Sequence, residues 1–282
     1  MSRPVREVAR WLAVAVVLSF VTLCLVWRLD GGRWERVETP SMGTVAPVGT
    51  LLWVRPADFD TLRPGDFITF RPPGSSGETY SHRVLARDPD GRISTQGVLS
   101  APDPWRLTAD DVVGKVEMRW WGVGHLVRAA PLLLLGGLLT VGAYVAVARR
   151  WKVPVALVLG CAVLSAAIAW YRPLVDAQQL SFAPSAGGGA DASYVGTGLL
   201  PIRLTAHDGP SVVMHAGEVG QVHVDRVDAG GKLRVTLAPA VPWWWWLALV
   251  VPCFVPAVAA SRPRPRGGHV AAHDGVVLAP SV

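Results

Sequence analysis

The chain has 282 residues, of which 51% are hydrophobic and 17% are charged, and its formal net charge is +6. This composition excludes an ordinary soluble protein, because the apolar share is too high. Its length leaves room for one or two domains beside membrane-spanning segments.

Four apolar runs are long enough to cross a hydrocarbon core of about 30 Å. They contain no charged residue and are Trp11–Trp27, Ala130–Ala148, Val153–Trp170 and Trp243–Ala260. Tryptophans lie at their ends, as is typical of membrane interfaces. A binding platform at Trp243–Trp246 is disfavoured because an apolar run follows it directly. A transporter is disfavoured because no run contains an ionisable residue.

Basic residues cluster beside the ends of these runs, which predicts the orientation, because Lys and Arg concentrate in cytoplasmic loops. The clusters are Arg3, Arg6 and Arg10; Arg149, Arg150 and Lys152; and Arg262, Arg264 and Arg266. We therefore expect residues 1–10, 149–152 and 261–282 in the cytoplasm, and residues 28–129 and 171–242 outside. The clusters supply nine of the 27 basic residues, so the positive charge indicates topology and no nucleic-acid partner.

The first run is predicted to be a retained anchor and not a cleavable signal peptide. Cys24-Leu25-Val26-Trp27-Arg28 ends it, and no small-x-small cleavage site follows. All three cysteines, Cys24, Cys161 and Cys253, lie inside spanning runs. Neither a disulfide framework nor a thiolate metal site is therefore expected.

The first outward segment, 28–129, has the short β-branched or aromatic stretches of a compact β domain. They are Thr50–Val54, Asp66–Phe70, Thr79–Ala86, Arg92–Gln96 and Gly114–Trp120. Turn sequences, Pro64-Gly65-Asp66 and Asp88-Pro89-Asp90-Gly91, separate some of them. The sequence leaves open whether Leu51, Leu52 and Trp53 face a core or the bilayer.

The second outward segment, 171–242, opens with a Gly/Ser/Ala stretch, 184–193, which is predicted to be a flexible linker. Strand-like alternation follows in Ile202–Thr205, Val212–His215, Val222–Val227 and Leu233–Leu237. A small antiparallel sheet or sandwich is expected. Its histidines, His207, His215 and His223, have no companion cysteine, and alternation along the strands accounts for them, so a metal site is disfavoured.

The residues that indicate chemistry lie in the first outward segment. A serine hydrolase needs a hydroxyl, a base that activates it and a third group that orients the base. The candidates are Ser41, which comes early, His82 within the predicted strands, and Asp103 beyond it.

Four segments resemble, in the correct order, the conserved boxes of type I signal peptidases. Thr39–Leu52 is similar to the nucleophile box, in which Ser-Met follows a membrane anchor, and Leu62–Phe70 to a turn-and-strand box. Tyr80–Val84 is similar to the box of the general base, and Thr95–Pro104 to the last box. The base is Lys in the common bacterial branch and His in the archaeal and endoplasmic-reticulum branch of this S26 family, so His82 indicates the Ser-His branch.

The chain departs from this pattern at two positions. Thr44 occupies the place of the proline in Ser-Met-x-Pro, and Val98 occupies the place of the first aspartate in the last box. Asp103 is therefore the acid left in that box. The resemblance covers about Val37 to Val116.

The resemblance implies a membrane-bound serine endopeptidase, a signal peptidase I, that removes signal peptides from exported proteins without cofactor or metal. In it, Ser41 is the nucleophile, His82 the general base, and Asp103 the group that orients the imidazolium. The implied partners are signal peptides, the lipid bilayer and the secretion machinery. The expected fold is a mixed, multi-pass protein of the cell membrane, with four helices, an outward β catalytic domain and a second small β ectodomain.

An alternative comes from a different functional class. The two departures, at Thr44 and Val98, also fit a catalytically inactive relative that binds peptides within a secretion or envelope complex. Activity distinguishes the two, since an inactive binder loses nothing when Ser41 or His82 is replaced by alanine.

Overall fold

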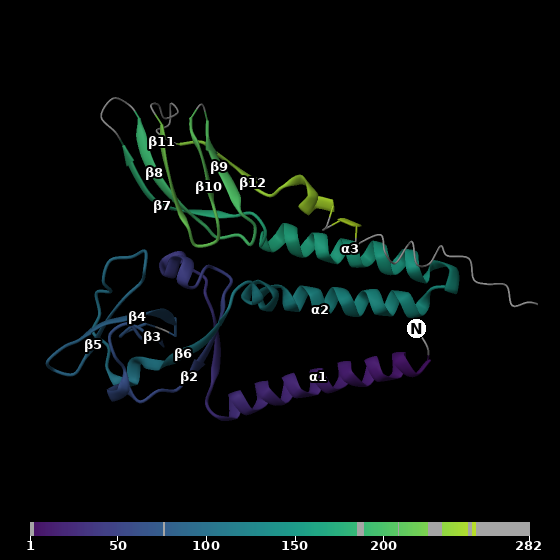
Figure 1. Cartoon of the computed structure of the whole chain (residues 1–282), viewed down its shortest axis with the longest axis horizontal. Helices are drawn as coiled ribbons and strands as arrows, with labels where there is room; N and C mark the ends of the chain where they lie inside the picture. The colour runs from purple at the N-terminus through teal and green to yellow at the C-terminus, as the bar shows by residue number, and fades with distance from the viewer. Residues whose placement is uncertain are drawn as a thin grey trace, which may run out of the picture.

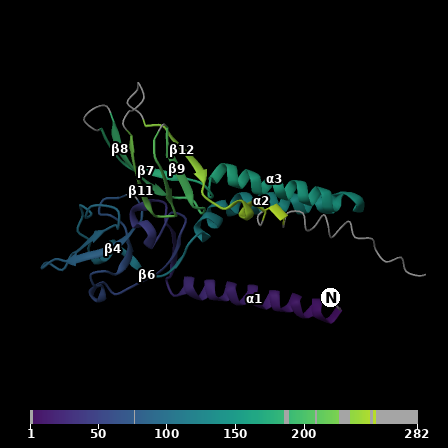
Figure 2. The ribbon, with the colours of Figure 1, turned by 45° about the horizontal axis from the view of Figure 1, so that its top comes forward.

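A computed structural model describes residues 3–75, 77–184, 189–207, 209–224, 233–247 and 250–251. Three long helices, α1 (Arg3–Leu29), α2 (Val123–Ala146) and α3 (Lys152–Tyr171), carry two β domains at one end (Figure 1; Figure 2). The start of α1 and the connection between α2 and α3 lie at the other end. We call residues 33–120 the sheet domain and residues 177–239 the sandwich.

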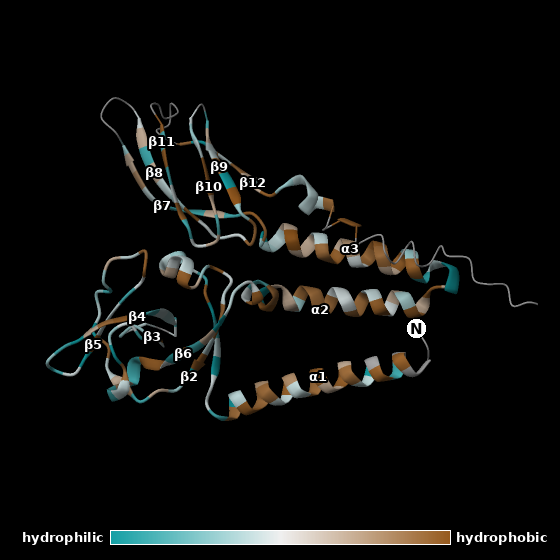
Figure 3. Ribbon diagram, in the orientation of Figure 1, coloured by the Kyte–Doolittle hydropathy of each residue, from teal (hydrophilic) through white to brown (hydrophobic). Residues whose placement is uncertain are grey.

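The described residues contain three candidate membrane spans, Arg10–Leu29, Val123–Ala146 and Arg149–Tyr171. Hydrophobic residues occur along all three helices (Figure 3), and few of them are buried by the rest of the protein. The prediction of a mixed membrane protein with a mainly β domain is confirmed at this level. The predicted fourth span, 243–260, falls mostly outside the described residues.

The second helix begins earlier than predicted. α2 starts at Val123, ahead of the predicted start at Ala130, so residues 123–129 are helical and do not belong to the β domain. His125 and Arg128 lie in this first part of the helix, and such polar residues break the apolar run by which a span is recognised in a sequence. A short 3-10 turn, Arg149–Trp151, joins α2 to α3.

The sheet domain is one antiparallel sheet of six strands in the order β1-β2-β6-β3-β4-β5. The strands are β1 (Arg33–Arg36), β2 (Leu51–Arg55), β3 (Phe67–Phe70), β4 (Tyr80–Arg87), β5 (Ile93–Gln96) and β6 (Val112–Trp120). Short 3-10 helices lie between them at Pro40–Val45, Phe59–Thr61 and Ala109–Asp111. All five predicted strands are present. The sequence missed β1, because Arg-Trp-Glu-Arg carries three charges and has no apolar alternation.

The turn before β3 follows its sequence closely. The Asp66 N–H donates to the Arg63 carbonyl at 3.0 Å, and Gly65 has a φ of 93°. These are the features of a type II turn, with proline at its second position and glycine at its third. Lys115 on β6 then binds the Asp66 carboxylate at 2.6 Å, so the turn is tied to the middle of the sheet.

A cluster of tryptophans joins the sheet domain to the first membrane helix. Trp53 is 1% exposed, and its ring centroid lies 5.0 Å from Trp27, 5.8 Å from Trp34 and 5.2 Å from Trp120. Leu51, Leu52 and Trp53 therefore face the core and not the bilayer. Trp27, expected at the membrane interface, is itself buried against the sheet.

The sandwich consists of two three-stranded antiparallel sheets, β10-β9-β12 and β11-β8-β7. Its strands are β7 (Ala177–Pro184), β8 (Ala190–Gly196), β9 (Ile202–Ala206), β10 (Ser211–Met214), β11 (Val219–Val224) and β12 (Val235–Pro239). Apolar side chains from both sheets fill the space between them, among them Tyr194, Leu204 and Met214.

The predicted flexible linker at 184–193 is wrong at its two ends, and residues 185–188 fall outside the described residues. Pro184 ends β7, and residues 190–193 begin β8, where Ala190 and Ala192 are buried between the two sheets. The segment Ala190-Asp191-Ala192-Ser193 does alternate with a period of two. Alanine replaces the usual β-branched residues at the buried positions, so composition alone suggested a linker.

We predict that Trp53→Ala lowers the free energy of unfolding of the full-length protein by about 3–5 kcal/mol, because it removes the centre of the tryptophan cluster. Denaturant unfolding in detergent, followed by tryptophan fluorescence, measures this change. Trp121→Ala is the control, since Trp121 is 51% exposed. Equal losses in the two variants would contradict a structural role of the cluster.

Candidate active site

Ser41 lies in the 3-10 segment Pro40–Val45, which we call the nucleophile segment. Pro40 is the first residue of this helix, where a missing N–H costs nothing. Met42 is 1% exposed and packs with Val37, Ala46, Leu52 and Val54. The buried Met42 side chain holds the segment on the sheet and leaves the neighbouring Ser41 hydroxyl partly exposed.

His82 comes from the first half of β4, where it pairs with Ile68 of β3. Its side chain is buried, and the rings of Phe70 and Tyr80 approach it edge-on, with centroids at 6.1 and 6.2 Å. These apolar neighbours restrict the imidazole to one orientation. The strand register therefore decides which side of the sheet His82 faces.

Asp103 is buried in the segment that follows β5. Its N–H donates to the Thr95 carbonyl at 2.8 Å, and the Thr95 hydroxyl donates to its Oδ2 at 2.6 Å. A buried carboxylate needs such donors to remain stable. Thr95 thus fixes both the backbone and the side chain of Asp103.

The structure brings the three predicted residues together in one chain of hydrogen bonds. His82 Nδ1 lies 2.7 Å from Asp103 Oδ2, and His82 Nε2 lies 2.9 Å from Ser41 Oγ. An ionised carboxylate only accepts, so Nδ1 carries the proton and Nε2 is left to accept the proton of Ser41. This is the geometry that an activated serine requires.

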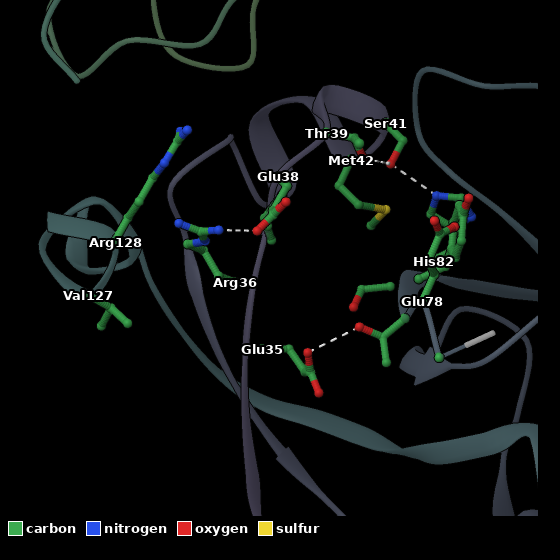
Figure 4. A pocket seen from close by; sticks show the side chains of 15 residues that line it. Glu35, Arg36, Glu38, Thr39, Ser41, Met42, Glu78, His82, Val127 and Arg128 are labelled. Carbon is green, nitrogen blue, oxygen red and sulfur yellow. Dashed lines mark hydrogen bonds and ion pairs between the residues drawn. The ribbon is translucent and has the colours of Figure 1, made fainter. Parts of the chain in front are cut away.

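A cleft of about 800 Å³ opens beside Ser41 and His82 (Figure 4). Residues 35–39 form one wall, and residues 77–82 form another. Val127 and Arg128, from the first turns of α2, complete the lining. The cleft therefore runs from the serine to the base of a candidate membrane helix.

Two threonines of the site were not singled out in the sequence. Thr95 supports Asp103, and Thr39 places its Oγ1 at 3.4 Å from Ser41 Oγ, on the wall of the cleft. Thr39 stands two residues before the serine within the nucleophile box, and this position was the only available signal. Val98, which occupies the place of an acid, is 47% exposed and lies outside the hydrogen-bonded chain.

The other histidines and the cysteines that the structure describes lie outside the hydrogen-bonded chain. In the sandwich, His215 pairs with Glu218 at 2.9 Å and His223 with Asp191 at 2.8 Å, both on the surface. The part of the chain that the structure describes has no group of three potential metal ligands. Cys24 and Cys161 are free thiols, and Cys253 falls outside the described residues.

No protein-family model matches this chain, and no curated protein is similar to it at a significant level. The function is therefore inferred from the arrangement of Ser41, His82 and Asp103 and from the cleft beside them.

We predict that Asp103→Asn reverses the His82 tautomer, because an amide that donates to Nδ1 forces the proton onto Nε2. Nitrogen NMR of histidine-labelled protein in detergent measures this, with His82→Gln identifying the His82 signals. Asp88→Asn is the control, since Asp88 binds Arg106 on the surface. An unchanged tautomer in Asp103→Asn would argue against the assigned geometry.

Proposed function

We propose that the protein is a membrane-bound serine endopeptidase that removes signal peptides from exported proteins, with its β domains on the outer side of the cell membrane. The observation that carries this proposal is the hydrogen-bonded chain from Ser41 through His82 to Asp103. The cleft beside this chain reaches α2, a candidate membrane helix, which favours a substrate held at the membrane. The resemblance of four segments to type I signal peptidases supports the same reaction.

The geometry accounts for the steps of acyl transfer. Ser41 Oγ attacks the scissile carbonyl carbon while His82 Nε2 takes the hydroxyl proton, and Asp103 stabilises the imidazolium that forms. The same nitrogen then donates the proton to the leaving amine, which breaks the peptide bond and leaves an acyl-serine. Water, activated by His82 in the same way, hydrolyses this ester.

The tetrahedral intermediate carries a negative oxygen that needs donors. The Ser41 N–H is one donor, and Pro40 cannot be another because it has no N–H. The Thr39 hydroxyl lies close enough to Ser41 Oγ, at 3.4 Å, to be the second. A substrate carbonyl that enters the cleft would meet both.

Two unpaired strand edges flank the cleft and suit an extended substrate. β1 ends the sheet and pairs only with β2. Tyr80, Ser81 and His82 of β4 pair with β3, but β5 begins to pair only at Arg83. An extended peptide can add as a strand along such an edge, with small residues beside the walls, as an Ala-x-Ala cleavage site requires.

The position of α2 beside the cleft favours a substrate that emerges from the bilayer. Val127 and Arg128 of α2 line the same cleft as Ser41. A signal peptide keeps its apolar region in the membrane and presents its cleavage site just outside. Such a chain would reach Ser41 directly along the start of α2.

We expect the detergent-purified protein to cleave a preprotein with an Ala-x-Ala leader after the second alanine. Ser41→Ala and His82→Ala should each reduce kcat by about 10³-fold or more, and Asp103→Ala by about 10²-fold or more. Gel analysis and mass spectrometry of the released peptides measure the rates and the site.

A matched control is Ser100→Ala, which removes a nearby serine hydroxyl outside the hydrogen-bonded chain. Binding of several leaders with no cleavage by any form of the protein would replace the enzyme with the peptide-binding alternative. Cleavage that persists in Ser41→Ala would reject Ser41 as the nucleophile.

We further expect Thr39→Val to lower kcat by about 10²-fold with a small change in KM, because an oxyanion donor acts mainly on the transition state. Thr39→Ser keeps the hydroxyl and should retain most of the activity. Steady-state kinetics on the same preprotein test both variants. Equal activity in Thr39→Val and Thr39→Ser would remove Thr39 from the proposed oxyanion site.

A further inference from the structure

The sandwich contacts the sheet domain at the nucleophile segment itself. A methyl group added at Gly217 would lie 2.3 Å from the carbonyl oxygen of Gly43 and 2.7 Å from the amide nitrogen of Thr44. The tip of the sandwich and the nucleophile segment lie side by side in both views (Figure 1; Figure 2). Gly217 therefore touches the backbone two residues beyond Ser41.

The turn that carries Gly217 is rigidly built. The Glu218 N–H donates to the His215 carbonyl at 3.1 Å, and Gly217, with a φ of 77°, donates to the Gly196 carbonyl of β8 at 2.7 Å. The Glu218 carboxylate accepts from the backbone N–H and from the ring of His215, at 2.8 and 2.9 Å. We call residues 215–218 the contact turn.

The nucleophile segment contacts a loop of its own domain as well as the contact turn. The Leu99 N–H donates to the Ser41 carbonyl at 2.8 Å, and a methyl group at Gly43 would lie 3.2 Å from the Leu99 side chain. Gly43 has φ 51° and ψ −134°, a backbone conformation that glycine tolerates best. Its position is thus set by two neighbours, one of which is the sandwich.

The rest of the interface leaves space beside this contact. A cavity of about 610 Å³ is lined by both domains, with Val45, Arg119 and Trp121 on one side and Leu199, His215 and Ala216 on the other. Leu199 and Gly122 form a second close approach. The Leu199 side chain lies 3.1 Å from where a methyl group on Gly122 would be. The contact turn meets the nucleophile segment at Gly43 and Thr44, two and three residues beyond Ser41.

We propose that the sandwich is a positioning domain, whose contact turn holds Gly43 and thereby fixes the Ser41 hydroxyl and N–H for attack. This inference rests on the proposed function. It adds that catalysis depends on the contact between the sandwich and the nucleophile segment. Gly217 is a positioning residue, since it touches the nucleophile segment and not the substrate. A shift of the segment by an ångström would cost about 10²-fold in rate.

The test uses the full-length protein in detergent and the variants Gly217→Ala and Gly91→Ala. Gly91 has a φ of 84°, close to that of Gly217, but a methyl group there meets nothing within 4 Å. Gly217→Ala should lower kcat on the preprotein by about tenfold or more and change KM by less than about twofold. Hydrogen exchange of residues 40–46, measured by mass spectrometry, should become faster in this variant only.

A second pair of variants tests the turn without adding bulk. Glu218→Ala removes the acceptor that fixes His215, whereas Asp191→Ala removes the similar partner of His223 elsewhere on the sandwich. Only Glu218→Ala should lower kcat and speed exchange at residues 40–46. This pair decides the question if Gly217→Ala does not fold.

The two readouts separate the inference from the proposed function. Faster exchange at residues 40–46 in protein that cleaves no leader would reject the peptidase and keep the docking contact. An active protein whose kcat and exchange at residues 40–46 are unchanged in Gly217→Ala and Glu218→Ala would overturn the positioning role.

Discussion

The packing of Trp53 against Trp27, Trp34 and Trp120 is the interaction on which the rest of the arrangement depends. It joins the end of α1 to three strands of the sheet, so the sheet cannot rotate freely on that helix. β2, which carries Trp53, begins at Leu51, a short connection after the nucleophile segment ends at Val45. The position of Ser41 relative to α1 is therefore stabilised by buried apolar surface, the largest stabilising contribution in a folded domain.

The site itself combines one exposed and two buried groups, which suits its proposed chemistry. His82 and Asp103 are buried, so their hydrogen bond is stronger than in water, and Thr95 donates a second hydrogen bond to the same carboxylate oxygen. Ser41 stays at the surface because Met42 takes the core position beside it. Rigid support on one side and an open cleft on the other are what a preorganised nucleophile needs.

The sheet domain and the sandwich lie closer together in space than along the chain. The sheet domain ends where α2 begins, and the sandwich follows α3, yet both return to the same end of the helices (Figure 1). The antiparallel pair α2 and α3 makes this return possible. As a result, the contact turn reaches Gly43 from a domain that supplies no residue to the hydrogen-bonded chain, so the membrane helices also serve to align the two domains.

Much of the fold and of the candidate site could be predicted from the sequence, because local sequence patterns reflect local folding preferences. Uninterrupted apolar runs indicated the candidate membrane helices, and β-branched stretches between turn residues indicated the strands of the sheet domain. The resemblance of four segments to type I signal peptidases pointed to Ser41, His82 and Asp103. Strands β1 and β8 consist largely of charged or small residues. They were not predicted from the sequence because pairing with other strands stabilises them. The positions of Thr39, Thr95 and Gly217 beside the site were decided only by the tertiary structure, since they depend on contacts that no local pattern encodes.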